Sequence, residues 1–222
     1  MENLISVKNL SVGFRSQHKK TNVVHSISFD IPKGKTTALV GESGSGKTVT
    51  ALSILKLLPY PTAFHSSGEI IYNKQNLLNM SDKNIQKIRG KNITTIFQEP
   101  MSSLNPLHTI EKQINEMLIT HSKISYADAT KKTKELLINV GLESISKRIK
   151  SYSYELSGGQ RQRVMIAMSI ANDPDLLIAD EPTTALDVTV QLQILNLIKN
   201  LQKKLNMAIL FISHDLTVVK HL

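Results

Sequence analysis

The sequence predicts an α/β fold built on a mostly parallel core sheet. Residues 36–40, 176–179 and 208–212 are short apolar runs that include β-branched residues, which is typical of buried strands. Stretches with apolar residues at helical spacing alternate with these runs, at residues 50–58 and 190–205. Strands that alternate with helices indicate a parallel sheet covered by helices. The length of 222 residues fits one domain.

Two parts of the chain are expected to depart from the parallel pattern. Residues 4–12 and 23–31 read as strands that precede the core, and the turn signal at residues 32–34 closes the second of them. They predict an N-terminal antiparallel β part. Residues 99–157 contain two apolar stripes at helical spacing and no signal for a parallel strand, which predicts an inserted helical subdomain.

The composition excludes several classes of protein. The chain contains no cysteine, so structural disulfides, thiolate metal sites and cysteine nucleophiles are excluded. No apolar run is long enough to span a membrane, and the first residues do not form a signal-peptide pattern. The formal net charge of +9 suggests nucleic acid or an anionic membrane as a partner. The basic residues are scattered and not interleaved with aromatic residues, which favours an ordinary solvated surface.

One glycine-rich stretch fits G-x-x-x-x-G-K-[ST], the phosphate-binding P-loop or Walker A motif. It lies between a predicted strand and a predicted helix and runs Gly41-Glu42-Ser43-Gly44-Ser45-Gly46-Lys47-Thr48. The glycines let the backbone approach a ligand, and the N–H groups of the loop and the helix start attract anions. Lys47 brings a charge to the outer phosphates, and the Thr48 hydroxyl can bind Mg²⁺. The motif predicts a P-loop NTPase.

Polar residues follow three predicted strands, at residues 93–97, 176–179 and 208–212. Gln98, the pair Asp180-Glu181 and His214 each come directly or almost directly after an apolar run. Open α/β sheets bind ligands at the carboxyl ends of their strands, so we expect these side chains near the P-loop. Asp180 can then hold Mg²⁺, and Glu181 can orient or deprotonate an attacking water. A lone glutamine or histidine is usually structural; the shared sheet edge favours a functional role.

Two further features allow more than one interpretation. Ser157, Gly158, Gly159 and Gln160 open a predicted helix, where they form either a second anion site or only a helix cap. Phe14 follows the first predicted strand and is either a ring that stacks on adenine or an ordinary core aromatic.

These signals, in this order, resemble the nucleotide-binding domain of ABC transporters. The distinctive element is Leu-Ser-Gly-Gly-Gln at residues 156–160, because many other ATPases share a P-loop. The resemblance covers essentially the whole chain and implies the ABC ATPase fold. It implies a RecA-like core with its antiparallel part at residues 1–98 and 158–222, and a helical subdomain at 99–157. Family members continue beyond the last predicted strand, so residues 1–222 are expected to be one ATP-binding domain that is short at its C-terminus.

The resemblance also implies a role for each candidate residue and two cofactors, ATP and Mg²⁺. The catalytic and metal-sensing roles fall to Gln98 of the Q-loop, the Walker B Asp180, the catalytic Glu181 and the switch histidine His214. The remaining nucleotide contacts fall to the P-loop, the signature Ser157–Gln160, Asp187 of the D-loop and the adenine-stacking Phe14.

The resemblance extends to partners and to a branch of the family. It implies a head-to-tail dimer with a second ABC cassette, membrane permease subunits, an indirect link to an extracytoplasmic substrate-binding protein, and no nucleic acid. The chain would then lie at the cytoplasmic face of the inner membrane. Residues 97–106 look like the peptide-importer branch, and residues 57–61, 108–114 and 179–191 look closest to the microcin C / peptide importer ATPase. The alternatives are a non-transport ABC ATPase acting on nucleic acid or ribosomes, and a truncated inactive cassette.

Overall fold

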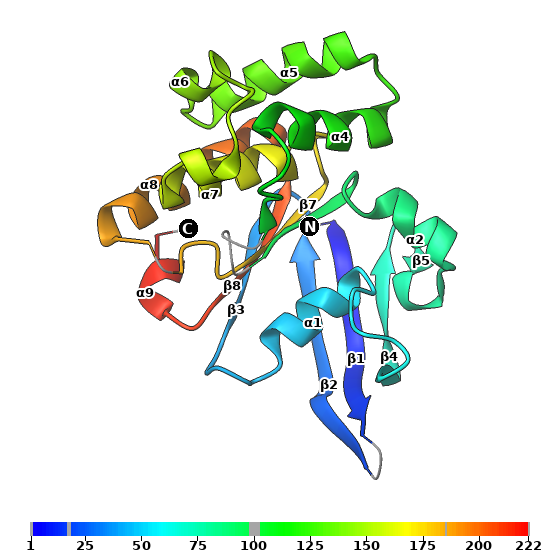
Figure 1. The fold of residues 1–222 in the computed structure, drawn as a ribbon. Helices are drawn as coiled ribbons and strands as arrows, with labels where there is room; N and C mark the ends of the chain where they lie inside the picture. The colour runs from blue at the N-terminus through cyan, green and yellow to red at the C-terminus, as the bar shows by residue number, and fades with distance from the viewer. Residues whose placement is uncertain (1, 17–18, 98–102, 185, 222) are drawn as a thin grey trace.

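The computed structural model describes residues 2–16, 19–97, 103–184 and 186–221. They form two four-stranded sheets with helices between and beside them (Figure 1). The antiparallel sheet contains, in spatial order, β2 (Lys20–Pro32), β1 (Asn3–Arg15), β4 (Ala63–Tyr72) and β5 (Gln75–Asn76). The second sheet contains, in spatial order, β3 (Thr36–Val40), β8 (Ala208–Ser213), β7 (Leu176–Asp180) and β6 (Ile93–Ile96).

All three pairings in the second sheet are parallel, as the sequence predicts. The helices are α1 (Lys47–Ile54), α2 (Asp82–Ile88), α4 (Ile110–Ser122), α5 (Tyr126–Asn139), α6 (Glu143–Ser146), α7 (Gly158–Ser169), α8 (Val188–Leu205) and α9 (Leu216–Val219). Two short 3-10 turns, η1 (Leu77–Asn79) and η2 (Ser153–Glu155), complete the fold. None of the described helices is both long and apolar enough to cross a membrane.

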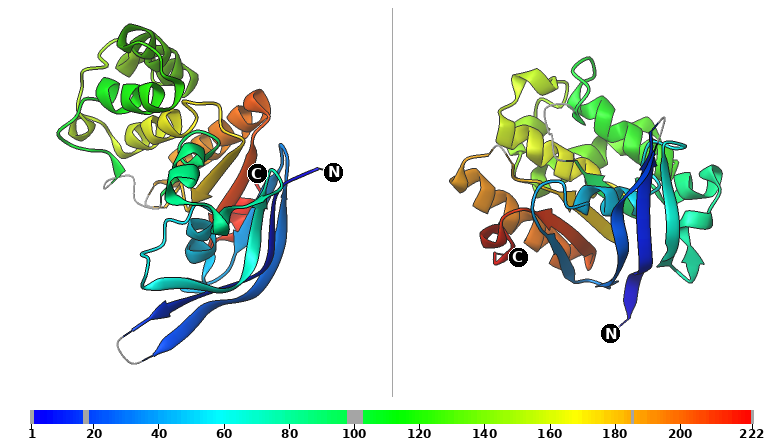
Figure 2. Two further views of the ribbon diagram at one scale, coloured as in Figure 1. Left: turned by 90° about the vertical axis from the view of Figure 1, so that its right-hand side faces the viewer. Right: turned by 90° about the horizontal axis from the view of Figure 1, so that it is seen from below.

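The parallel sheet contributes to two hydrophobic clusters, one on each face. In β7, Leu177 and Ala179 pack with the helices α4, α5, α7 and α8. The alternate residues Leu176 and Ile178 pack with α1 and the antiparallel sheet. This alternation follows from the two-residue period of a strand. The inserted helices therefore share a core with the parallel sheet, and they lie at the opposite end of the molecule from the antiparallel hairpin (Figure 2).

Helix α1 ends earlier than its apolar spacing predicts. Residues up to Leu58 were expected to be helical, but the helix stops at Ile54, and Lys56 takes a left-handed conformation with φ 50°. Arg89, far along the chain, donates from Nε to the carbonyl oxygen of Leu55 and from Nη2 to that of Lys56, both at 2.7 Å. A distant guanidinium thus satisfies the carbonyl groups that a longer helix would use.

The carboxyl ends of the parallel strands meet at one edge of the sheet. Val40 of β3 lies opposite Ser213 of β8, and Asp180 of β7 lies opposite Ile212. Residues that follow these strands are therefore brought together, although they are far apart in the sequence.

Candidate functional site

The P-loop connects β3 to α1, which is the context that its motif requires. Gly44 and Gly46 have positive φ angles of 79° and 90°, which favour glycine. A Cβ atom on Gly41 would lie 2.9 Å from Oγ of Ser45, so a side chain there would push the Ser45 hydroxyl aside. Gly46 precedes α1 without a side-chain cap, which leaves the first N–H groups of the helix available to an anion.

The side chain of Lys47 reaches back to the first residues of the P-loop. Its ammonium group donates to the carbonyl oxygens of Gly41 and Glu42, both at 2.7 Å. The positive charge is therefore held beside the backbone of the P-loop. A phosphate group that enters the loop meets this charge together with the N–H groups of the helix start.

Asp180 ends β7 as a nearly buried carboxylate, with 6% of its surface exposed. The hydroxyl of Thr48 acts on this carboxylate and lowers its pKa, while Oδ1 is buried without a hydrogen-bond partner among the described residues. Burial raises the pKa of Asp180 above its ordinary value, and the charge of Glu181 adds to this shift. The Thr48 hydroxyl and the charge of Lys47 oppose the shift.

A Mg²⁺ ion fits this carboxylate and hydroxyl. Mg²⁺ prefers oxygen ligands and is usually held by one or two carboxylates together with substrate phosphates. The described residues contain no group of three or more His, Asp or Glu that could hold a metal ion by themselves. The unpartnered Oδ1 of Asp180 beside the Thr48 hydroxyl suits a cation that shares its ligands with a nucleotide.

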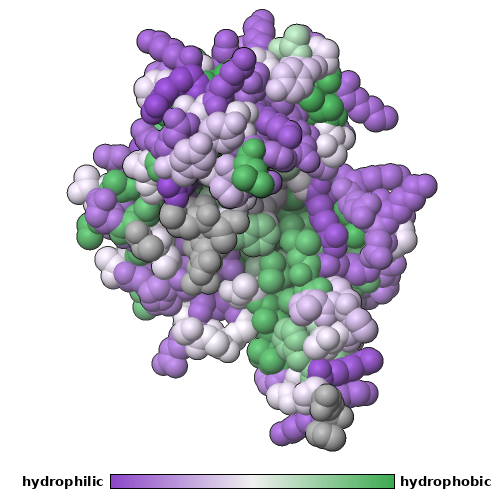
Figure 3. All heavy atoms as spheres, viewed as in Figure 1, coloured by the Kyte–Doolittle hydropathy of each residue, from purple (hydrophilic) through white to green (hydrophobic). Residues whose placement is uncertain are grey.

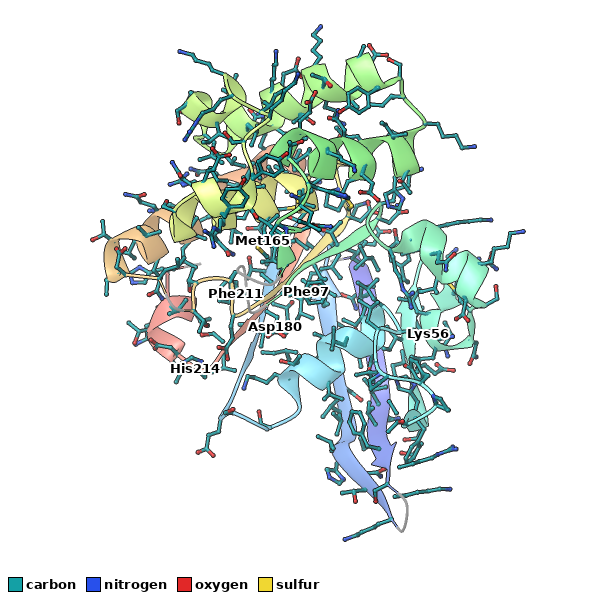
Figure 4. The ribbon with its side chains drawn as sticks, viewed as in Figure 1. Lys56, Phe97, Met165, Asp180, Phe211 and His214 are labelled. Atoms are coloured by element: carbon teal, nitrogen blue, oxygen red, sulfur yellow. The ribbon has the colours of Figure 1, made fainter. Side chains whose placement is uncertain are left out.

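Glu181 and His214 form a hydrogen-bonded pair at the ends of β7 and β8. Oε1 of Glu181 lies 3.0 Å from Nδ1 of His214, and the hydroxyl of Thr184 donates to Oε2 at 3.0 Å. The pair borders a hollow of about 210 Å³. Partial burial raises the pKa of Glu181, but the hydrogen bonds from His214 and Thr184 outweigh burial and hold it below its ordinary value. Figure 4 shows Asp180 and His214 at the same edge of the sheet.

Thr184 was not predicted as a site residue. It lies three residues after Glu181 in the loop that leaves β7, and its hydroxyl reaches back to that carboxylate. Glu181 itself has a φ of 46°, a conformation that is uncommon for a residue with a side chain. The sequence signal for this contact is only a hydroxyl residue in a turn, which is too common to identify the role.

The signature segment forms the capped start of α7. The N–H of Gln160 donates to Oγ of Ser157 at 3.3 Å, and Oε1 of Gln160 accepts from the N–H of Ser157 at 3.0 Å. The predicted cap is therefore present, and Ser157 and Gly158 are exposed to solvent. The helix start also remains suited to an anion, because the hydroxyl proton of Ser157 is not used by the cap.

The start of α8 packs directly against the start of α7. Asp187 caps α8 by accepting from the N–H of Val190 at 2.9 Å. A Cβ atom on Gly159 would lie 3.0 Å from Cγ1 of Val190, so glycine permits this close approach. No hydrogen bond between described residues joins this pair of helix starts to the P-loop. The structure thus places Val190, whose N–H Asp187 caps, against Gly159 of the signature segment.

The predicted adenine-stacking residue Phe14 belongs to the antiparallel sheet. Phe14 lies in β1, opposite Thr21 and Ala63, where it is partly buried and packs against the core of the antiparallel sheet. That is the core interpretation, and stacking on a base remains a prediction. Gln98 lies outside the described residues; Phe97 precedes it directly after β6.

Known proteins resemble this chain in sequence. The Peptidoglycan transport ATP-binding protein YejF of Agrobacterium fabrum is 57% identical over 98% of this chain and 40% of its own length. The Oligopeptide transport ATP-binding protein OppD of Bacillus subtilis is 50% identical over 97% of this chain and 60% of its own length. The chain therefore spans about 40–60% of the length of these curated relatives.

Solved structures and a family comparison agree with these relatives. The ATP-binding cassette MJ0796, in a dimeric post-hydrolysis state bound to ADP and Pi, matches with a TM-score of 0.85 at 27% identity. The match covers 98% of this chain and 90% of that chain. The expected α/β fold with a parallel core sheet and an antiparallel part is thereby confirmed. A sequence model of the ABC transporter family matches residues 24–184. The chain belongs to the ABC transporter family, as an ATP-binding cassette of the P-loop NTPase fold.

Proposed function

We propose that the chain is the ATP-binding and ATP-hydrolysing part of an ABC importer that takes up peptides. The observation that carries the proposal is the arrangement at one sheet edge: the buried Asp180 beside Thr48 of the P-loop, and Glu181 hydrogen-bonded to His214. The names of the relatives YejF and OppD, which refer to peptidoglycan and oligopeptide transport, support the peptide class of cargo. A microcin C-like peptide is one member of that class.

ATP binding would begin at the P-loop. The triphosphate would occupy the N–H groups of residues 41–48 and displace the ammonium group of Lys47 from its two carbonyl partners. Thr48 and Asp180 would hold Mg²⁺, with Gln98 as a further ligand. The cation supplies charge that stabilises the transferring phosphoryl group. Phe14 would stack on the adenine.

Hydrolysis would depend on Glu181. Its pKa lies below the ordinary value, so the carboxylate is ionised at neutral pH and can accept a proton from an attacking water. The ring of His214 orients this carboxylate and would also contact the γ-phosphate. The relative MJ0796 bound to ADP and Pi in a post-hydrolysis state supports a hydrolytic cycle.

We propose that a second cassette completes the site. The starts of α7 and α8 pack together at Gly159 and Val190, and no hydrogen bond between described residues joins Ser157–Gln160 or Asp187 to Lys47. Across a head-to-tail dimer, the start of α7 would supply N–H groups and the Ser157 hydroxyl to the γ-phosphate of the partner. The dimeric state of MJ0796 supports this arrangement. Loss of the γ-phosphate after hydrolysis would then release the interface.

The helical part would connect ATP hydrolysis to membrane permeases. We propose residues 99–157 as the helical subdomain and residues 1–98 and 158–222 as the core. An apolar groove of about 250 Å³ lies between them, lined by Leu57 and Phe97 among others. These two side chains are 37% and 45% exposed, and Figure 3 shows apolar surface in the middle of this face. A permease segment in this groove would place the chain at the cytoplasmic face of the membrane.

The proposal is tested by reconstituting the full-length protein with the permease subunits that accompany it. The expected result is Mg²⁺-dependent release of phosphate from ATP that increases when a peptide and its binding protein are added. Phosphate release without any effect of peptide or permease would refute the transport part. Absence of hydrolysis in the complete complex would refute the enzymatic part and favour an inactive cassette.

A further inference from the structure

Three methionines line the apolar groove beside Phe97. Met117 comes from α4, and Met165 and Met168 come from α7. The chain contains no cysteine, so methionine thioethers are its only sulfur groups. Met117 and Met168 are partly exposed, whereas Met165 is buried and only 7% exposed. Met117 and Met168 therefore present part of their surface to solvent in this groove, where an oxidant can approach them (Figure 4 labels Met165 and Phe97).

We propose that Met117 and Met168 are oxidation-sensitive positions whose conversion to methionine sulfoxide changes the groove from apolar to polar. The oxidant is hydrogen peroxide. A sulfur lone pair attacks one peroxide oxygen, the O–O bond breaks, and the departing hydroxide takes a proton to become water. The sulfur is oxidised by two electrons and the peroxide is reduced by two.

The groove also contains a hydrogen-bond donor that no described residue uses. Oγ1 of Thr94 lines the groove, is buried, and has no partner among the described residues. A sulfoxide oxygen is an acceptor, which a hydroxyl of this kind can satisfy. A sulfoxide oxygen that reached Oγ1 of Thr94 would find one hydrogen-bond donor in the groove.

Oxidation has a direct consequence for whatever occupies the groove. Methionine is flexible and polarizable and adapts to an apolar partner, whereas its sulfoxide is polar and must be hydrogen-bonded when buried. If the groove docks a permease segment, as proposed above, oxidation of Met117 and Met168 weakens that contact and uncouples the cassette. Enzymatic reduction of the sulfoxides reverses the change.

The test exposes the full-length protein to hydrogen peroxide and follows each methionine by peptide mass spectrometry. Met117 and Met168 are expected to oxidise several-fold faster than Met207, which is 1% exposed. In parallel, the fluorescence of 8-anilinonaphthalene-1-sulfonate reports the apolar character of the groove. It is expected to fall after oxidation of the wild type and to stay unchanged in the double variant Met117→Leu/Met168→Leu.

Met80 provides a matched control. It is also partly buried, but it packs against the antiparallel core instead of the groove. Met80→Leu should therefore leave the oxidation-dependent fall in fluorescence unchanged. The proposal is overturned if Met117 and Met168 oxidise no faster than Met207, or if the double variant loses fluorescence as the wild type does. Both readouts need neither ATP nor permease, so a failed proposed function leaves them intact.

Discussion

Nδ1 of His214 lies 3.0 Å from Oε1 of Glu181, so the ends of two neighbouring parallel strands share one hydrogen bond at the P-loop edge. The histidine is exposed, while the carboxylate is partly buried. A hydrogen bond to one oxygen of a carboxylate restricts the orientation of the whole carboxylate group. This contact joins two loop residues that are far apart in the sequence.

Glu181→Gln should separate ATP binding from hydrolysis. The amide keeps the size of the side chain but cannot accept a proton from water, so turnover should fall by about 10²–10⁴-fold. Binding of a fluorescent ATP analogue should be almost unchanged, because Lys47 and Asp180 remain. Stopped-flow binding and phosphate release measure the two effects. Near-normal turnover in this variant would remove Glu181 from the catalytic role.

Thr184→Ala should move the acid limb of the pH–rate profile to higher pH. The Thr184 hydroxyl is one of the groups that hold the pKa of Glu181 below its ordinary value. Without it, the pKa rises, so protonation of Glu181 begins at higher pH and activity is lost earlier on acidification. The same sign holds for stability: a depressed pKa stabilises the fold above the unfolded-state pKa, and this is lost as pH falls.

Thr184→Ser is the control for that variant, since it keeps the hydroxyl at the same position. It should retain the wild-type acid limb. If the alanine and serine variants titrate alike, the hydroxyl of Thr184 does not act on Glu181 through the observed 3.0 Å contact.

The hydrogen bonds of Thr184 and Arg89 could not be predicted from the sequence, whereas the local patterns could. The parallel strands, the P-loop and the cap at Ser157 are local patterns, and the structure contains each of them. The hydrogen bond from Thr184 depends on the left-handed backbone of Glu181, which no neighbouring residue requires. The early end of α1 depends on Arg89, more than thirty residues away. Contacts of this kind are set by tertiary packing and leave no periodic signal.

Asp180→Asn should weaken the dependence of nucleotide binding on Mg²⁺. The amide is neutral and supplies only one oxygen, whereas the carboxylate offers a buried Oδ1 without a partner. We expect the gain in ATP affinity on adding Mg²⁺ to fall by about tenfold or more. Titration of the ATP analogue with and without Mg²⁺ measures this gain. An unchanged gain would mean that the cation is held elsewhere.

Arg89→Ala should destabilise the fold without touching the P-loop. The guanidinium donates to the carbonyl oxygens of Leu55 and Lys56 where α1 ends, and its loss leaves them without these donors. We expect a loss of roughly 2–3 kcal/mol in the free energy of unfolding, measured by urea denaturation. Arg89→Lys keeps the charge and one donor, so its loss should be smaller. Equal losses in the two variants would mean that the two-donor guanidinium carries the whole effect, and an unchanged stability of Arg89→Lys would assign it to the alkyl stem and the charge.

Mixing two inactive variants should restore activity if the site is shared between cassettes. Lys47→Ala removes the phosphate-binding charge, and Ser157→Arg blocks the signature segment, so each variant alone should form only defective sites. In a head-to-tail dimer of the two, one site combines the intact P-loop of one chain with the intact signature of the other. The mixture should therefore hydrolyse ATP well above the sum of the separate variants.

A double variant carrying both changes, mixed with wild type, is the control, because every site in that mixed dimer is damaged. If the mixture gives only the sum of the two separate ATPase activities, each cassette completes its own site. Ser157 would then have to move to Lys47 within the same chain.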